Sequence, residues 1–171
     1  MIRIETERLI LREIDAERDL DGWARTMADE RTVRYIGGVV MDRAQAWRNM
    51  ATVIGHWTIR GYGFFSLECR ETGQWVGRVG PWYPEGWPSP EVGWTIMREH
   101  WGKGYATEAG RACIDFARDT LGWDSVIHVI LQGNEPSMAV AERLGSRLLR
   151  SQQGLPGVTE DEVLIYGQQL R

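Results

Sequence analysis

Residues 92–109 read VGWTIMREHWGKGYATEA, which places a glycine-rich turn between a strand and a helix. Apolar residues alternate with other residues over Glu91–Met97, and this spacing is typical of a strand. Apolar residues then recur at intervals of three and four from Ala106 onwards, which predicts a helix that ends near Gly122. A strand that runs through a tight turn into a helix indicates an α/β chain.

The turn itself, His100–Tyr105, has the chemistry of an anion site. The first turn of a helix exposes unpaired N–H groups and the positive end of the helix dipole. Gly102 and Gly104 have no Cβ, so the amides around them can close on phosphoryl oxygens, and Lys103 adds a mobile positive charge. A glycine turn that binds nothing is the plain alternative.

Two familiar phosphate motifs do not fit this turn. A Walker loop continues from Gly-Lys to Ser or Thr, but Gly104 follows Lys103, and Met97 occupies the place of the first glycine. A dinucleotide fingerprint needs a third small residue where Thr107 stands, and it belongs to the first βα unit of a parallel sheet. A nucleotide-binding protein of another kind stays open as a minor alternative.

Hydrophobic spacing along the whole chain predicts a mixed, mostly antiparallel sheet with one strand–helix–strand crossover over about 91 to 131. The stretch Pro81–Pro90 holds four prolines and predicts a surface loop, because proline has no N–H to donate. Helices are expected after Asp15, Asp42 and Tyr105, and from Asn134. Strands are expected over Leu9–Ile14, Tyr62–Cys69, Trp75–Val79, Glu91–Met97, Val126–Leu131, Arg147–Arg150 and Glu162–Gln168.

Composition limits the class of protein. A length of 171 residues predicts a single domain over residues 1–171. A net charge of −4 argues against nucleic-acid binding, and no apolar run approaches the roughly 18 residues of a membrane span. The N-terminus has no signal-peptide core, so we expect a cytoplasmic protein. Cys69 and Cys113 lie in no CxxC or Cys/His cluster, which predicts no metal site and favours two buried thiols over a disulfide.

Three blocks of the sequence resemble the GNAT N-acetyltransferase superfamily. WGKGYATEA, from Trp101 on, resembles its acetyl-CoA pyrophosphate loop, Arg/Gln-x-x-Gly-x-Gly/Ala, with Trp101 departing from the usual Arg or Gln. Asn134–Gly145 is similar to the family's Asn-x-x-Ser helix that ends in Leu-Gly. Glu5–Arg12 resembles the start of one branch, the ribosomal-protein N-terminal acetyltransferase-like enzymes. The blocks follow one another in the family's order and span the chain.

The resemblance implies a fold and a coenzyme. The expected fold is α/β (α+β): a GNAT-type mixed sheet, flanked by about four helices, whose central parallel strands splay apart after a bulge. The pantetheine arm of acetyl-CoA, the cosubstrate, would enter that gap. Ile96, Met97 and Arg98 would bind pantetheine, Asn134 would hold its amides or only cap a helix, and an amide at Ile96 or Met97 would polarise the acetyl carbonyl. The pyrophosphate would lie on the backbone of Trp101, Gly102, Lys103, Gly104, Tyr105 and Ala106.

The implied reaction is direct acetyl transfer to a neutral primary amine. Glu91 is the candidate general base, with Glu85 in reserve. Ser137 would hydrogen-bond or protonate the leaving thiolate, although serine is also common near a helix N-terminus. Tyr105 and His128 are more typical of packing residues than of acids or bases.

The acceptor is expected to bind across the sheet from the coenzyme, between the first two helices and the Pro81–Pro90 loop. Trp82, Tyr83, Glu85 and Trp87 are the candidate acceptor-binding residues, and the aromatic ones could equally cover edges of the core. The branch resemblance favours the N-terminal α-amine of a protein or peptide. A small-molecule amine and a non-catalytic CoA-binding module are the alternatives. Members of the family often form homodimers, so a homodimer is also an expected state.

Overall fold

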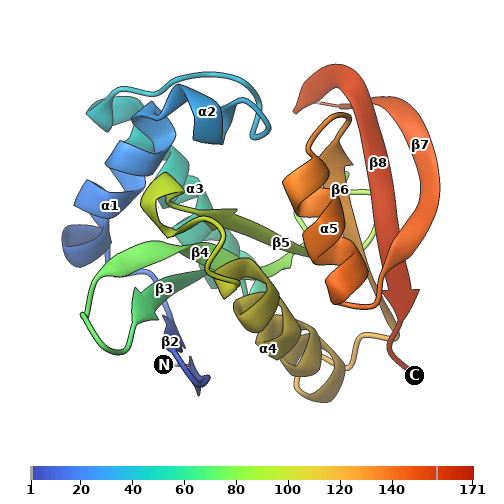
Figure 1. Cartoon of the computed structure of the whole chain (residues 1–171), viewed down its shortest axis with the longest axis horizontal. Helices are drawn as coiled ribbons and strands as arrows, with labels where there is room; N and C mark the ends of the chain where they lie inside the picture. Colours follow the sequence, from blue (N-terminus) through green and yellow to red (C-terminus); the bar gives the residue numbers. More distant parts are fainter. Residues whose placement is uncertain (1, 157) are drawn as a thin grey trace.

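The computed structural model describes residues 2–156 and 158–171. Its strands are β1 (Arg3–Glu5), β2 (Leu9–Arg12), β3 (Phe65–Cys69), β4 (Trp75–Trp82), β5 (Glu91–Ile96), β6 (Ser125–Leu131), β7 (Arg147–Leu155) and β8 (Thr159–Gln169). Its helices are α1 (Ala16–Ala28), α2 (Glu30–Val33), α3 (Arg43–Arg60), α4 (Tyr105–Asp119) and α5 (Glu135–Arg143), with a 3₁₀ turn, η1, at Arg98–His100. The strands form one eight-stranded sheet in the order β1-β2-β3-β4-β5-β6-β8-β7 (Figure 1). This confirms the expected mixed α/β architecture.

The sheet is split between β5 and β6. These two strands are parallel, whereas the other neighbouring strands pair antiparallel. They meet at one pair, Glu91↔Ile127, beyond which they diverge (Figure 1). The predicted splayed pair is therefore confirmed. The nearby bulge lies between β3 and β4, at Leu67/Glu68, and β5 itself pairs with β4 in unbroken register.

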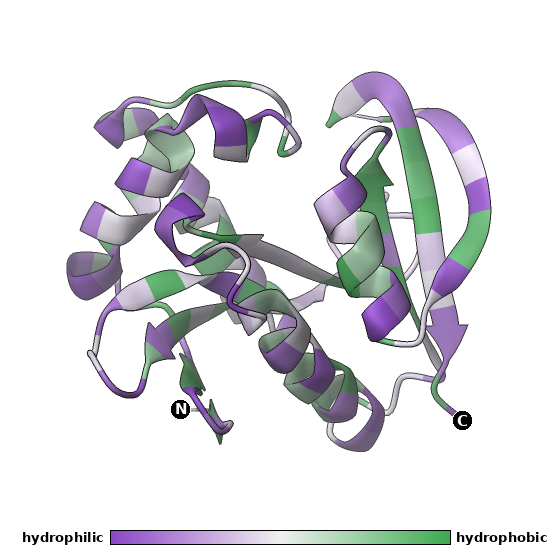
Figure 2. Cartoon of the chain, viewed as in Figure 1, coloured by the Kyte–Doolittle hydropathy of each residue, from purple (hydrophilic) through white to green (hydrophobic). Residues whose placement is uncertain are grey.

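Helices cover the two faces of the sheet. On one face, α4 packs through Ala109, Cys113 and Ala117, which are completely buried. These side chains are small, so the helix can approach the strands closely. On the other face, α1 contributes Trp23 and Met27 to a second core shared with α3. Figure 2 shows β6 as mostly hydrophobic, as predicted for a central strand, and both hydrophobic and hydrophilic residues on α1 and α4.

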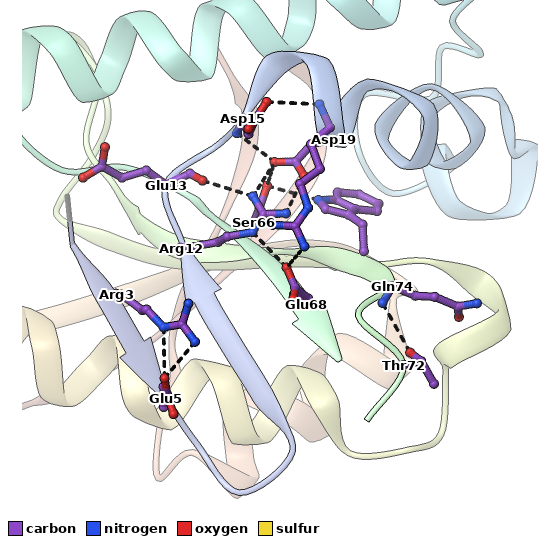
Figure 3. A network of polar contacts seen from close by, with 12 residues as sticks. Arg3, Glu5, Arg12, Glu13, Asp15, Asp19, Ser66, Glu68, Thr72 and Gln74 are labelled. Atoms are coloured by element: carbon purple, nitrogen blue, oxygen red, sulfur yellow. Dashed lines mark hydrogen bonds and ion pairs between the residues drawn. The ribbon is translucent and has the colours of Figure 1, made fainter. Parts of the chain in front are cut away.

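A buried polar network fixes the start of α1 over the sheet (Figure 3). The carboxylate of Asp19, which is completely buried, accepts hydrogen bonds from Arg12 at 2.7 and 2.9 Å and from the Ser66 hydroxyl at 2.6 Å. It also accepts the N–H of Asp15 at 2.9 Å. A buried carboxylate with this many donors is compensated for its loss of water. The network therefore ties α1 to β2 and β3.

Several elements begin or end at other residues than their sequence patterns predict. The predicted strand over Trp75–Val79 continues to Trp82, so the expected surface loop from Pro81 begins two residues too early. Pro81 is tolerated because the ladder between β3 and β4 ends at the pair Phe65↔Val79. Beyond Val79, β4 needs no N–H to donate toward β3. The short elements β1 and α2 were not expected, and β7 is longer than predicted because it pairs with β8 along most of its length.

Cys69 and Cys113 are both buried free thiols, as favoured from the sequence. Burial raises the pKa of the Cys113 thiol, which packs as an apolar side chain under α4. Among the helices described, none has the length and apolar character needed to cross a membrane.

Candidate active site

The turn between β5 and α4 presents a row of free backbone amides. The helix begins at Tyr105. The Glu108 N–H donates to the carbonyl of Gly104, the residue just before the helix, at 3.0 Å. Within the part of the chain that the structure describes, the N–H groups of residues 102–107 have no protein partner. Gly104 caps the helix with φ +80°, a conformation that residues with a side chain rarely adopt. This arrangement suits the anion that the sequence analysis expected.

Trp101 holds the turn against the strand. Its indole N–H donates to the carbonyl of Ile96 at 2.7 Å, although the residue stays 48% exposed. The residue that departs from the family's Arg or Gln thus ties the end of β5 to the beginning of the turn. Its side chain supports the backbone rather than supplying a charge.

The N-terminal turn braces the same segment from the other side. Arg8 donates to the Lys103 carbonyl at 2.8 Å and forms an ion pair with Glu108 at 2.7 Å, while the Thr6 hydroxyl donates to Glu108 at 2.6 Å. Burial disfavours the charged form of Glu108, but the hydrogen bonds from Thr6 and Arg8 outweigh it and lower its pKa. Thr6 and Arg8 belong to the sequence block from Glu5 to Arg12, which therefore has a positioning role.

Charged side chains beside the turn point away from the split. Lys103 lies 3.2 Å from His100, and both line a hollow of about 470 Å³ against α1, together with Arg25 and Glu99. Arg98 forms an ion pair with Asp29 at 3.5 Å, ahead of α2. The turn therefore offers backbone amides, more than side-chain charge, toward the split.

Backbone groups of β5 face the split at every second residue. The N–H of Met97 donates to the Val76 carbonyl of β4 at 2.9 Å, and hydrogen bonds of an antiparallel ladder alternate along the strand. Thr95 therefore also bonds to β4, and the backbone groups of Trp94 and Ile96 face β6. Because β6 has diverged there, the Ile96 amide is available to a ligand, whereas the Met97 amide is already bonded.

Glu91 lies where β5 and β6 separate. The carboxylate is buried and accepts the N–H of Val129 on β6 at 3.0 Å and the indole N–H of Trp87 at 2.6 Å. Burial raises the pKa of Glu91 to about 7, against the lowering effect of both hydrogen bonds. A carboxylate that titrates near neutral pH has the proton affinity of a general base.

Ser137 approaches the split from α5. Asn134 caps the N-terminus of α5, where its side chain accepts the Ser137 N–H at 3.4 Å. The indole N–H of Trp94 donates to the Ser137 hydroxyl oxygen at 3.3 Å. The hydroxyl hydrogen is left free to be donated elsewhere, and an incoming hydrogen bond makes it a better donor.

The predicted acceptor-binding residues do not form one cluster. Trp87 contacts Glu91, whereas the ring of Trp82 stacks on His56 with 4.3 Å between ring centroids. The N–H of Tyr83 donates to the same imidazole at 3.2 Å. The Glu85 side chain is fully exposed and lies 3.8 Å from Arg60. Only Trp87 is brought to the candidate base.

Two residues weighed as acids or bases are packing residues. His128 is buried and lies 2.6 Å from the Val92 carbonyl and 2.9 Å from the Ser146 hydroxyl, and burial lowers its pKa to about 4. It therefore stays neutral and donates from Nδ1. The Tyr105 ring lies under the Arg8 guanidinium, 5.0 Å from centroid to Cζ, and its hydroxyl is 3.9 Å from the Cys69 sulfur.

Sequence reasoning missed Trp94, Thr6 and Arg8. From the sequence, Trp94 is one of several apolar residues on one face of a strand. Alternation shows which face a residue occupies, but not that its indole reaches the Ser137 hydroxyl. Thr6 and Arg8 contact residues about a hundred positions away, and no local pattern reports such contacts. The similarity of Glu5–Arg12 to a family block was the signal that pointed to them.

Free amides at a strand–helix turn beside a split parallel strand pair suit an anionic coenzyme, and comparisons with known proteins identify the class of enzyme. The model of the acetyltransferase (GNAT) domain matches residues 8–147. An uncharacterized protein of Bacillus subtilis (strain 168), YkkB, is 30% identical over 151 residues, which is 84% of each chain. An acetyltransferase structure from Agrobacterium tumefaciens str. C58 has a TM-score of 0.83 at 29% identity and covers 98% of this chain and 94% of its own.

A structure of RimL, a ribosomal alpha-N-protein acetyltransferase in complex with coenzyme A, has a TM-score of 0.81 and covers 98% of both chains. At 15% identity it shows a shared fold. The chain belongs to the GNAT acetyltransferase family, as the three sequence blocks indicated. It is an acetyl-CoA-dependent acetyltransferase, and enzymes of this family transfer the acetyl group to an amine.

Proposed function

We propose that the acceptor is the N-terminal α-amine of a protein or peptide, and that the β5–α4 turn and the split hold acetyl-CoA during a direct transfer. The observation that carries the proposal is the row of unpartnered amides at residues 102–107 beside the split. The diphosphate would lie on these amides, and the pantetheine arm would extend along Trp94 and Ile96 of β5. Asn134 would contact the arm from the start of α5.

Glu91 and Ser137 lie at the two ends of the site and suit two different steps, the attack of the amine and the departure of the thiolate. Glu91 would accept the proton of the attacking amine, directly or through water, while the Ile96 N–H would stabilise the developing oxyanion, a contact worth about 3 kcal/mol. The carbon–nitrogen bond forms first and gives a tetrahedral intermediate, which collapses as the carbon–sulfur bond breaks. Ser137 would donate a hydrogen bond to the sulfur as it leaves as thiolate, and the amine proton ends on Glu91.

The proton affinity of Glu91 favours an α-amine over a lysine side chain. At pH 7, deprotonation costs about 1.2 kcal/mol for an α-amine and about 4.6 kcal/mol for a lysine, from ordinary pKa values near 7.9 and 10.4. The pKa of the Glu91 carboxyl, about 7, is close to the pKa of an α-amine and far below that of a lysine side chain. The fold shared with RimL, a ribosomal alpha-N-protein acetyltransferase, supports the same acceptor class.

A paired-peptide screen with thiol detection tests this acceptor. Each peptide is supplied with acetyl-CoA in two forms, one with a free α-amine and a blocked lysine, the other with a blocked α-amine and a free lysine. We expect thiol release with the first form alone. Release only with free lysines, or only with small non-peptide amines, would reassign the acceptor.

Ser137→Ala is expected to lower kcat about tenfold and to leave the Kd of CoA nearly unchanged. The effect is modest because a thiol with a pKa near 8.5 leaves without full protonation. Steady-state kinetics and calorimetric titration separate the two quantities. Ser151→Ala, at an exposed position of β7, is the matched control. An unchanged kcat in Ser137→Ala would remove the acid role.

A further inference from the structure

A buried arginine has no anionic partner on the face of the sheet covered by α1 and α3, where the acceptor is expected. Arg78, in the middle of β4, is only 7% exposed. Its Nε is completely enclosed and has no hydrogen-bond partner, and no ion pair to its guanidinium is found among the described residues. Burying an unpaired cation costs folding free energy, so the presence of Arg78 at this position needs an explanation.

The nearby buried carboxylates are already bound. Asp19 accepts Arg12 and Ser66, and Glu91 accepts Trp87 and Val129. The guanidinium instead lies between two rings, 4.8 Å from the Trp23 centroid and 4.6 Å from the Phe64 centroid. Aromatic faces attract the charge, but they accept none of the hydrogen bonds that a guanidinium can donate.

Arg78 remains charged under working conditions. Burial lowers its pKa to about 10, which is still three units above neutral pH. The rings thus hold a positively charged fork with unused donors. The planar guanidinium fork matches the two oxygens of a carboxylate.

The position of Arg78 relates it to the reaction. It pairs with Thr95 of β5, at a Cα distance of about 5.5 Å for a hydrogen-bonded pair, and Thr95 precedes the Ile96 amide proposed for the oxyanion. Its side chain lies with Trp23 and Phe64, in the core under α1 and α3, across the sheet from α4 and α5.

Phe64 connects Arg78 to the candidate base. A Cβ added to Gly93 would lie 3.1 Å from the Phe64 ring and 3.4 Å from the Glu91 carboxylate, so both groups lie over Gly93. The Phe64 ring therefore has Arg78 over it and lies beside Gly93, next to the Glu91 carboxylate.

We propose that Arg78 binds a carboxylate of the acceptor, which makes the acceptor an amine that carries a carboxylate a few bonds from its amino group. This inference rests on the transfer reaction and the site of the proposed function. A peptide source would narrow the proposed acceptor class, and a free amino acid would replace it. Two acceptor sources share the chemistry: a free amino acid, through its α-carboxylate, and a peptide N-terminus with an acidic residue at its second position. When a buried hydrogen-bond donor is paired only by the substrate, the enzyme discriminates strongly against analogues that lack the group accepting that hydrogen bond.

The test measures kcat/KM, calculated per neutral amine, for matched amines with and without a carboxylate, because amidation also lowers the pKa of the α-amine. One arm compares L-amino acids with their carboxamides. The other compares peptide amides whose second residue is aspartate or glutamate with those that carry asparagine or glutamine. We expect a carboxylate preference of about 10- to 100-fold in one arm, which identifies the source. Arg78→Gln should bring that ratio close to one, and Arg78→Lys should retain part of it. The ratio within one variant cancels losses from partial unfolding.

Equal kcat/KM across both arms in the natural protein, or an undiminished ratio in Arg78→Gln, would overturn the inference. If none of these amines is acetylated, calorimetric titration of the same panel into the CoA-saturated protein decides. Tighter binding of carboxylates that is lost in Arg78→Gln supports the inference, and equal binding of acids and amides contradicts it. Acetyl transfer without a carboxylate preference contradicts the Arg78 assignment alone. Transfer only to lysine side chains contradicts the proposed function instead.

Discussion

Replacing Glu91 with glutamine is expected to lower kcat about 100-fold, within the usual range for loss of a general base. In the natural protein, kcat/KM should rise with pH through about 7, because only the ionised carboxylate accepts the amine proton. A second rise belongs to the acceptor amine. Glu91→Gln should lose the first rise and keep the second. Rate–pH profiles with one peptide acceptor measure both changes.

The pH profile separates a catalytic from a structural role. Glu91 also accepts hydrogen bonds from Val129 and Trp87 where the strands diverge, so glutamine would satisfy only one of them and could lower activity by disturbing the split. A low kcat that retains the rise near pH 7 would assign Glu91 to structure. Glu71→Gln, at an exposed carboxylate of the β3–β4 turn, is the matched charge control. Loss of the rise in Glu85→Gln instead would transfer the role to Glu85.

Replacing Gly104 with valine is expected to raise the Kd of CoA about 100-fold while kcat at saturation changes less. The backbone there has φ +80°, so a branched residue would move the chain and misalign the amides of residues 102–107. The loss of one charge-assisted hydrogen bond to the diphosphate, worth about 1.5–3 kcal/mol, accounts for an effect of this size. Calorimetric titration with CoA measures it.

Gly73→Val controls for backbone strain. Gly73 has φ +67° in the β3–β4 turn, with open space around its Cα, and lies outside the proposed cleft. This variant should lose stability without losing CoA affinity. An unchanged Kd in a folded Gly104→Val protein would remove the turn from the pyrophosphate site.

The fold could be predicted from the sequence where the signal is local. The α4 stripe, the Asp15 and Asp42 caps and the hydrophobic run of β6 are set by spacing and capping, and they occur as expected. The strand through Pro81 could not be predicted, because whether a proline breaks a ladder depends on where the neighbouring strand ends. Short elements such as α2 carry too few residues for a periodic signal.

The candidate site was only half predictable. The free amides follow from Gly102 and Gly104 at a helix start, which is a local property. The raised pKa of Glu91 follows from burial between strands that are far apart in sequence, and so does the isolation of Arg78 between Trp23 and Phe64. Side chains from distant segments create these environments, and alternation along a single strand shows only which face a residue takes.

A crystal structure of the complex with CoA tests the central claim most directly. The account predicts diphosphate oxygens within hydrogen-bond distance of the N–H groups of residues 102–107, with the pantetheine arm between β5 and β6 and its sulfur near Ser137. A diphosphate bound in the hollow beside Lys103 and Arg25, with the split left empty, would contradict it.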